Sequence, residues 1–293
     1  MPKPFSDRLL SAIEHTGSTC VVGLDPMPHL FPAWCAAGDP IETCRSFCFT
    51  AIDAVAGLVP MIKPQSAYFE VLGPAGMQVL FDVHKYAQSA GLLVLLDAKR
   101  GDIASTAQAY AEAYLARGEG RFEFDAMTVN PYLGPDSLEP FVKVAKNANA
   151  GLFVLGVTSN PEGGYLQKAE LASGGPLYAK VAEMAAPMNQ ELMGERGYGG
   201  VGLVAGATFP EEARHLRALL PQSIFLVPGI GAQGGDYEAL RNFFNPDGLG
   251  AVVSSSRAVT YSAPAAKSPA ETVEAIRIAA REMTDRVNDV RAY

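Results

Sequence analysis

The sequence predicts an α/β protein of the TIM (β/α)8 barrel class, and three observations support this prediction. Eight short apolar runs alternate with helical patterns along 293 residues, a usual length for such a barrel. A polar or charged residue follows nearly every run, as a ring of loops at one barrel face requires. No linker or break in composition divides the chain, so residues 1–293 are expected to form a single domain. A doubly wound open sheet is the competing architecture.

The predicted strands are runs of Val, Leu, Ile, Phe, Met and Ala with the length and bulk of strands buried on both faces. They cover residues 20–25, 59–64, 92–97, 124–129, 152–157, 200–205, 224–228 and 250–254. Because such strands alternate with helices, parallel pairing through helical crossovers is expected.

The predicted helices have recognisable start and stop signals. The first begins near Ser6, which can cap it, and ends at Gly17. Gly91 ends another, and Pro210 suits the first position of the helix that it opens. A polar, glycine-rich segment at 159–175 is expected to be a loop. The helices after the first cover residues 41–56, 77–90, 103–116, 136–148, 177–193, 211–220, 237–242 and 270–290.

Composition and charge exclude several classes of protein. The net charge of −8 argues against a general nucleic-acid binder. The first residues lack the apolar core of a signal peptide, and no run approaches the length needed to span a membrane. We therefore expect a cytoplasmic protein with no nucleic-acid or membrane partner.

The cysteines and histidines show no metal-ligand spacing. In a long cytosolic chain the cysteines are expected to be free thiols that act as small buried hydrophobes. They are Cys20, Cys35, Cys44 and Cys48. The histidines fall in helical or loop stretches away from the strand ends, so surface positions are expected for all of them. They are His15, His29, His84 and His215.

The chemistry is expected where the third strand ends in Asp97-x-Lys99-x-x-Asp102. In an extended segment Asp97 and Lys99 point to the same side. Gly101 then lets the backbone turn, so that Asp102 projects in another direction. A lysine flanked by two carboxylates at the mouth of an apolar strand favours a catalytic site, although an ion-pair cluster that closes the strand end is the alternative.

Other strands also end in polar residues, and active sites of such barrels lie at this face. Asp25 and Lys63 end the first two strands, so that with Asp97 and Lys99 they would form a row of alternating charge. The remaining strand-end residues are Asn130, Thr158, Ser159, Thr208, Ser256 and Arg257.

The last two strand ends predict a phosphate site. The segment 228–236, which includes Pro228, Gln233 and Gly234, exposes backbone N–H groups at close approach. Ser256 and Arg257 follow the last strand and supply a hydroxyl and a guanidinium. The loops after strands seven and eight usually form the phosphate-binding site of this fold, and arginine can form two parallel hydrogen bonds to a phosphate. A phosphorylated substrate is therefore expected.

The motifs together resemble orotidine 5′-phosphate decarboxylase, in the longer bacterial branch of that family. Its most specific element is the run 97–103 with Thr106 after it, and similar motifs lie at 23–26, 62–64, 128–131, 158–161 and 228–231. The resemblance covers essentially the whole chain. It implies a homodimer of TIM barrels that converts orotidine 5′-phosphate to UMP and CO₂ without a metal or organic cofactor.

The resemblance also implies roles for residues of the charged row. Lys99 resembles the proton donor to C6 of the pyrimidine, and Asp97 would lie against the departing carboxylate. Asp25 and Lys63 resemble ligands of the ribose hydroxyls, with Lys63 also pairing with Asp97. A lysine fixed between carboxylates stays protonated, so it can stabilise negative charge at C6 and then neutralise it.

Further roles follow from the same resemblance. Asp102, Ile103 and Thr106 would act across the dimer interface in the partner's site. The phosphate ligands would be Gln233 and Arg257, from the segment and strand end described above. Either Thr158 or Ser159 would contact the base, and the spacing leaves both open.

Three other readings compete with this one. A hexulose-phosphate synthase shares Asp-x-Lys-x-x-Asp but needs an acid near the second strand end for Mg²⁺, where this chain has Lys63-Pro64-Gln65. A Schiff-base aldolase needs a lysine that loses its proton easily, which acidic neighbours oppose. A barrel kept only for binding would have a broken charge row, and this row is complete.

Overall fold

The structure is a computed structural model that describes residues 3–35, 38–230 and 236–291. Its strands form a closed barrel in the order β1-β2-β3-β4-β5-β6-β7-β8, and all pairs are parallel. The predicted barrel is confirmed, and the alternative prediction of a doubly wound open sheet is wrong. The strands are β1 (Cys20–Leu24), β2 (Met61–Pro64), β3 (Leu93–Arg100), β4 (Ala126–Val129), β5 (Gly151–Val157), β6 (Val201–Ala205), β7 (Phe225–Pro228) and β8 (Ala251–Ser255).

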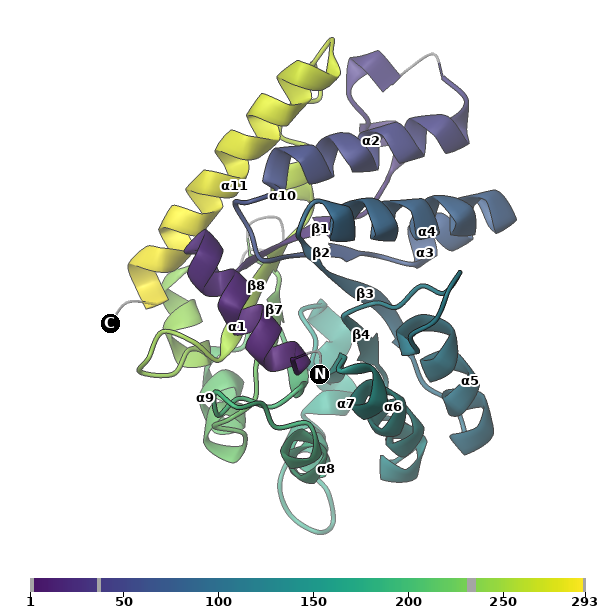
Figure 1. Ribbon diagram of the computed structural model, residues 1–293. Coiled ribbons are helices and arrows are strands. Elements are labelled where there is room, and N and C mark those ends of the chain that lie inside the picture. Colours follow the sequence, from purple (N-terminus) through teal and green to yellow (C-terminus); the bar gives the residue numbers. More distant parts are fainter. Residues whose placement is uncertain (1–2, 36–37, 231–235, 292–293) are drawn as a thin grey trace.

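Helices surround the barrel, as Figure 1 shows. The α-helices are α1 (Phe5–Thr16), α2 (Pro40–Val55), α3 (Ala67–Glu70), α4 (Gly73–Ser89), α5 (Ala104–Leu115), α6 (Pro135–Ala148), α7 (Gly164–Gln167), α8 (Leu177–Glu191), α9 (Pro210–Leu219), α10 (Arg257–Thr260) and α11 (Pro269–Arg291). Short 3₁₀ helices are η1 (Pro28–Leu30), η2 (Ala33–Cys35), η3 (Pro161–Gly163) and η4 (Glu238–Phe243).

The core has two layers because successive strand residues point to opposite faces. On β1, Val22 packs outward in a large cluster between the strands and the helices. Val21 points inward, to a second cluster inside the barrel. Met61, Leu95 and Phe153 of other strands fill the same interior. The barrel is therefore a packed core, and a substrate can enter only at one of its ends.

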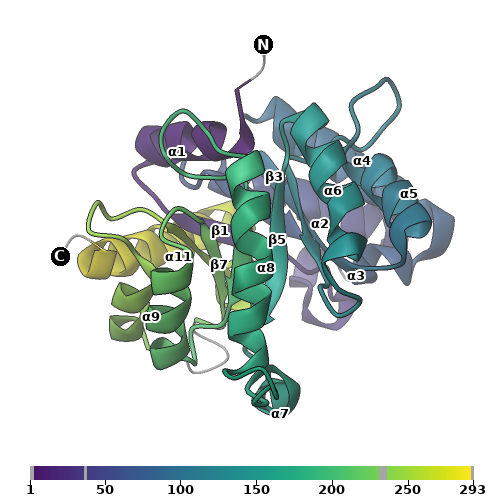
Figure 2. The ribbon, with the colours of Figure 1, turned by 90° about the horizontal axis from the view of Figure 1, so that it is seen from below.

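Helix α1 closes one of these ends. Its side chains Phe5, Leu9 and Ile13 are buried in the inner cluster, and the Phe5 ring meets that of Phe153 edge-on at 6.1 Å. Arg8 forms an ion pair with buried Asp125. Figure 2 shows α1 at one end of the molecule and α7 at the other. The end near α7 is thus left for the site.

The structure differs from the sequence prediction in a few places. The segment expected as a loop at 159–175 contains η3 and α7, and the helix expected at 237–242 is the 3₁₀ helix η4. The short helices α3 and α10 were not predicted, because four residues cannot show an apolar period. His84 is fully buried in α4 against Phe124, so a surface position was wrong for it.

All four cysteines are buried and free, as predicted. Within the described ranges, no helix combines the length and apolar character that a membrane span requires.

Candidate active site

The carboxyl end of β3 contains a bulge that centres on Lys99. Leu96 pairs with Met127 and Arg100 pairs with Val129, so three residues of β3 face a single residue of β4. Lys99 has a φ of 49°, in the left-handed region that few non-glycine residues adopt. The sequence did not predict this bulge, and β3 continues through it to Arg100, so that Gly101 follows the end of the strand.

Gly101 also permits close packing. A Cβ at this position would lie 2.7 Å from the carbonyl oxygen of Asn130, at the end of the neighbouring strand β4. Only a residue without a side chain lets the two strand ends approach this closely.

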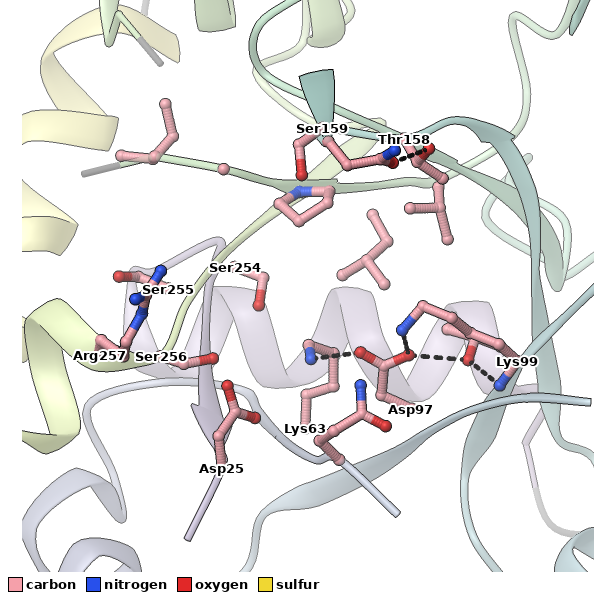
Figure 3. A pocket seen from close by; sticks show the side chains of 18 of the residues that line it. Asp25, Lys63, Asp97, Lys99, Thr158, Ser159, Ser254, Ser255, Ser256 and Arg257 are labelled. Atoms are coloured by element: carbon pink, nitrogen blue, oxygen red, sulfur yellow. Dashed lines mark hydrogen bonds and ion pairs between the residues drawn. The ribbon is translucent and has the colours of Figure 1, made fainter. Parts of the chain in front are cut away.

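The bulge brings two lysines onto one carboxylate. Lys99 Nζ lies 2.5 Å from Asp97 Oδ1, and Lys63 Nζ from β2 lies 2.7 Å from Asp97 Oδ2. The hydroxyl of Thr128 on β4 donates to Asp97 Oδ1 at 3.0 Å. Asp97 and Lys63 are buried, whereas the Lys99 side chain is 43% exposed toward the open end of the barrel. Figure 3 shows this row along one wall of the pocket.

These contacts fix the charge states of Asp97 and Lys63. Burial alone would raise the pKa of Asp97, but the charges of Lys63 and Lys99 outweigh it and hold that pKa well below its usual range. Burial alone would lower the pKa of Lys63, but Asp97 and Asp25 outweigh it and raise that pKa. At neutral pH Asp97 is therefore a carboxylate and Lys63 is a cation.

Asp25 ends the row on the side of β1. Its Oδ1 is buried and has no hydrogen-bond partner among the described residues. Its backbone carbonyl accepts a hydrogen bond of 2.5 Å from the hydroxyl of Tyr261, which also accepts the N–H of Met27 at 2.7 Å. The loop after β1 is thus held in place, and Asp25 lines the cavity described next.

The row lies in a cavity of about 400 Å³ at the carboxyl ends of the strands. Residues predicted from the sequence that line it are Asp25, Lys63, Asp97, Lys99, Thr158, Ser159, Pro228, Ser256 and Arg257. Apolar side chains complete its wall: Leu155, Val204 and Leu226. Apolar walls with a few placed polar groups are typical of a site for a small molecule.

The side of the cavity away from Lys99 carries hydroxyls and a guanidinium. Ser254 and Ser255 end β8, Ser256 follows, and Arg257 begins α10 (Figure 3). Gly23 allows this arrangement, since a Cβ there would lie 1.9 Å from Ser256 Oγ. Hydroxyls and an arginine at this strand end are suited to hold an anion. The predicted ligands Gln233 and Gly234 fall outside the described residues.

Thr158 and Ser159 occupy the rim after β5. The Thr158 hydroxyl donates to Asn160 Oδ1 at 2.6 Å and accepts from Gln167 Nε2 at 2.7 Å. Gln167 Oε1 also accepts the Thr158 N–H at 2.9 Å. Because the Thr158 hydroxyl is already engaged on both sides, Ser159 is the better placed of the two to contact a ligand.

Three predicted residues do not line the cavity of this chain. Asp102, Ile103 and Thr106 follow β3 at the outer rim, and the Ile103 side chain is 65% exposed. Asp102 accepts the backbone N–H of Ile103 at 2.7 Å. A role for them in this chain's own cavity is thus not supported by the geometry.

Sequence reasoning gave no role to Thr128, Gln167 or Tyr261, which hold the site residues in place. Thr128 had a visible signal, since it is a hydroxyl residue in an otherwise apolar strand. Gln167 and Tyr261 had none, because their partners are distant in sequence or set by the loop path. Among the described residues, no three His, Cys, Asp or Glu side chains gather as a metal-ligand group.

Comparison with known proteins identifies a family and several relatives that this chain resembles. The model of the orotidine 5′-phosphate decarboxylase / HUMPS family matches residues 19–276. A relative named orotidine 5′-phosphate decarboxylase from Rhodopirellula baltica is 48% identical over 269 residues, 88% of this chain and 88% of its own length. One with the same name from Roseiflexus castenholzii is 42% identical over 285 residues, 97% of each chain.

A solved structure agrees with these relatives. The OMP decarboxylase of Leishmania donovani superposes with a TM-score of 0.80 at 32% identity, and the match covers 99% of both chains.

Proposed function

The chain belongs to the orotidine 5′-phosphate decarboxylase / HUMPS family, and we propose that its pocket converts orotidine 5′-phosphate to UMP and CO₂, with Lys99 as the proton donor. The named relatives support the decarboxylase activity and, with it, a place in pyrimidine biosynthesis. One observation carries the assignment of residues. The Lys63–Asp97–Lys99 row and the Ser254–Arg257 strand end line the same cavity.

In the proposed reaction the bond between C6 and the carboxylate carbon breaks. CO₂ leaves, and the electron pair of that bond remains on C6. The Lys99 ammonium, which already points into the cavity, donates a proton to C6, so UMP is formed and the lysine becomes neutral. Its partly exposed side chain can then regain a proton from water.

Asp97 assists by repelling the carboxylate of the substrate, but this repulsion is too small to be the main effect. Two unit charges ~4 Å apart at an effective dielectric of ~20 repel by roughly 4 kcal/mol. Very slow uncatalysed reactions need on the order of 20 kcal/mol of barrier lowering. The larger share must come from the fixed charge of Lys99 at C6 and from the binding energy of the remote phosphate.

The rest of the cavity suits the rest of the substrate. Asp25, whose buried Oδ1 lacks a partner, and Lys63 would bind the ribose hydroxyls. Arg257 and Ser256, with the segment that includes Pro228, Gln233 and Gly234, would hold the phosphate. Ser159 would contact the base, because Thr158 is already engaged by Gln167.

We also propose a cytoplasmic homodimer. Large apolar side chains are exposed after four successive strands of the described chain: Val71, Ile103, Tyr132, Leu133, Tyr165 and Leu166. Exposed large apolar side chains at the same ends of neighbouring strands suit a subunit interface. Asp102, Ile103 and Thr106 lie at the same rim, so pairing of two chains there would let them reach the partner's cavity.

The activity is tested by following the loss of the orotate chromophore when purified protein meets orotidine 5′-phosphate. We expect turnover to be the same with and without a metal chelator. Loss of turnover with the chelator would contradict a cofactor-free reaction, and no turnover of orotidine 5′-phosphate under either condition would contradict the decarboxylase activity. Trapping of a covalent adduct by borohydride would indicate the Schiff-base reading.

The shared site is tested by mixing two inactive variants, Lys99→Ala and Asp102→Asn. A mixed dimer contains one cavity with both an intact Lys99 and an intact partner Asp102. Random exchange should therefore restore roughly a quarter of the wild-type sites. Failure of mixed dimers to regain any activity would contradict the action of Asp102 across the interface.

A further inference from the structure

Thr128 lies at the one point of β4 that faces the bulge of β3. Leu96 and Arg100 keep their ladder partners, while residues 97 to 99 between them have only Thr128 opposite. A bulge removes backbone groups from the regular ladder, and a buried N–H without a partner is costly. The N–H of Lys99 meets this need through a side chain, because it donates to Thr128 Oγ1 at 2.9 Å.

The same hydroxyl has a second partner. It donates its own hydrogen to Asp97 Oδ1 at 3.0 Å, the oxygen that also receives Lys99 Nζ. A threonine hydroxyl has one hydrogen to donate, and here Asp97 receives it. Thr128 is 1% exposed, so the arrangement is shielded from water. One oxygen thus contacts both the backbone and the ionic partner of Lys99.

These two contacts stabilise a strained backbone conformation at Lys99. A non-glycine residue in the left-handed region costs on the order of 1–3 kcal/mol, and it persists only where the surroundings impose it. The φ of 49° at Lys99 is imposed by the bulge and by the Thr128 hydroxyl. Without that hydroxyl, Lys99 could relax to an extended conformation, and its ammonium would leave the position that the reaction uses.

We propose that Thr128 is a positioning residue for the decarboxylation: its hydroxyl holds Lys99 in the left-handed conformation and orients the Asp97 carboxylate that receives the Lys99 ammonium. This inference rests on the proposed function. Thr128 acts through Lys99 and Asp97, so its loss should affect the reacting geometry more than the binding of ribose or phosphate.

The test compares Thr128→Val, which keeps the shape and removes the hydroxyl, with Thr128→Ser, which keeps the hydroxyl. A lost hydrogen bond to a charged group predicts a fall in kcat of about tenfold or more in Thr128→Val. KM and the affinity for UMP should stay within about threefold of wild type. Thr128→Ser should recover most of the lost kcat. If Thr128→Val does not fold, Thr128→Ala replaces it in the test. We expect the same fall in kcat, because Thr128→Ala also removes the hydroxyl.

Thr50→Val is the matched control, since Thr50 is a buried threonine in α2 whose hydroxyl donates to Ser46 O at 2.8 Å, away from the site. Its kcat should equal that of wild type. The inference is overturned if Thr128→Val keeps wild-type kcat, if KM or UMP affinity changes instead, or if Thr128→Ser gives no recovery. Wild-type protein without decarboxylase activity would instead contradict the proposed function.

Discussion

At the scale of single residues, the site depends on one carboxylate shared by two lysines. Asp97 is buried, and its two oxygens are each committed to a different ammonium group. Breaking such a buried pair leaves an uncompensated charge, which is more costly than never having had the pair. The position of Lys99 is therefore set by its acid partner and by the strained backbone of the bulge.

The phosphate ligand gives the first residue-scale prediction. Arg257→Ala should lower the affinity for UMP by about ten- to a hundredfold, because it removes charge-assisted hydrogen bonds. Uridine, which lacks the phosphate, should bind wild type and variant equally. Calorimetric titration with both ligands measures the difference, with Arg214→Ala, in an exposed ion pair of α9, as the control. An equal loss of uridine affinity would contradict a phosphate role.

Buried His84 gives a prediction for pH. Burial lowers the pKa of His84 to about 3, from 6.5 in an exposed histidine. As pH falls below 6.5, the unfolded chain takes up a proton that the folded chain does not, so stability falls. The contribution is about 1.4 kcal/mol per pH unit until the folded pKa is reached.

His84→Leu should remove this contribution, so its free energy of unfolding should depend less on pH between 6.5 and 4.5 than that of wild type. Urea titrations across this range measure the slope, and exposed His29→Leu serves as the control. Equal slopes for wild type and His84→Leu would show that His84 is protonated in the folded chain.

At the scale of elements, the sequence predicted the strands and most helices because apolar runs, glycine stops and proline starts are local signals. It did not predict that α1 closes the barrel, since the partners of Phe5 and Arg8 lie far along the chain. It also missed the bulge in β3. Nothing local distinguishes a lysine at positive φ from one in a regular strand, because the cause is the pairing with β4.

The closing helix gives a prediction for stability. Phe5→Ala should lower the free energy of unfolding by about 3–5 kcal/mol, because the ring is buried inside the barrel mouth. It should leave kcat unchanged, since the cavity lies at the carboxyl ends of the strands, whereas α1 lies at the end of the molecule opposite to α7 (Figure 2). Urea unfolding and the decarboxylation assay test both parts, with half-exposed Ile278→Ala as control. A large loss of kcat in the folded variant would contradict this separation.

At the scale of the whole molecule, the fold class and most of the site followed from strand ends that converge on one face. The charged row could be predicted because parallel strands bring their carboxyl ends together. The roles proposed for Asp102, Ile103 and Thr106 could not be derived from one chain, since they would require a second copy. The single-domain organisation also remains a prediction.

Thermal unfolding tests both whole-molecule expectations. A single-domain homodimer should unfold in one cooperative transition whose midpoint rises with protein concentration, because association stabilises the folded chain by mass action. Scanning calorimetry over a hundredfold range of concentration measures this. Two separate transitions would contradict the single domain, and a midpoint independent of concentration would contradict the dimer.

The most direct test of the central claim is the turnover of Lys99→Ala measured beside its affinity for UMP. If Lys99 protonates C6, kcat should fall by more than about a thousandfold, while the variant stays folded and still binds UMP through the phosphate end of the cavity. Turnover near the wild-type rate would show that another group supplies the proton, and the proposed mechanism would be wrong.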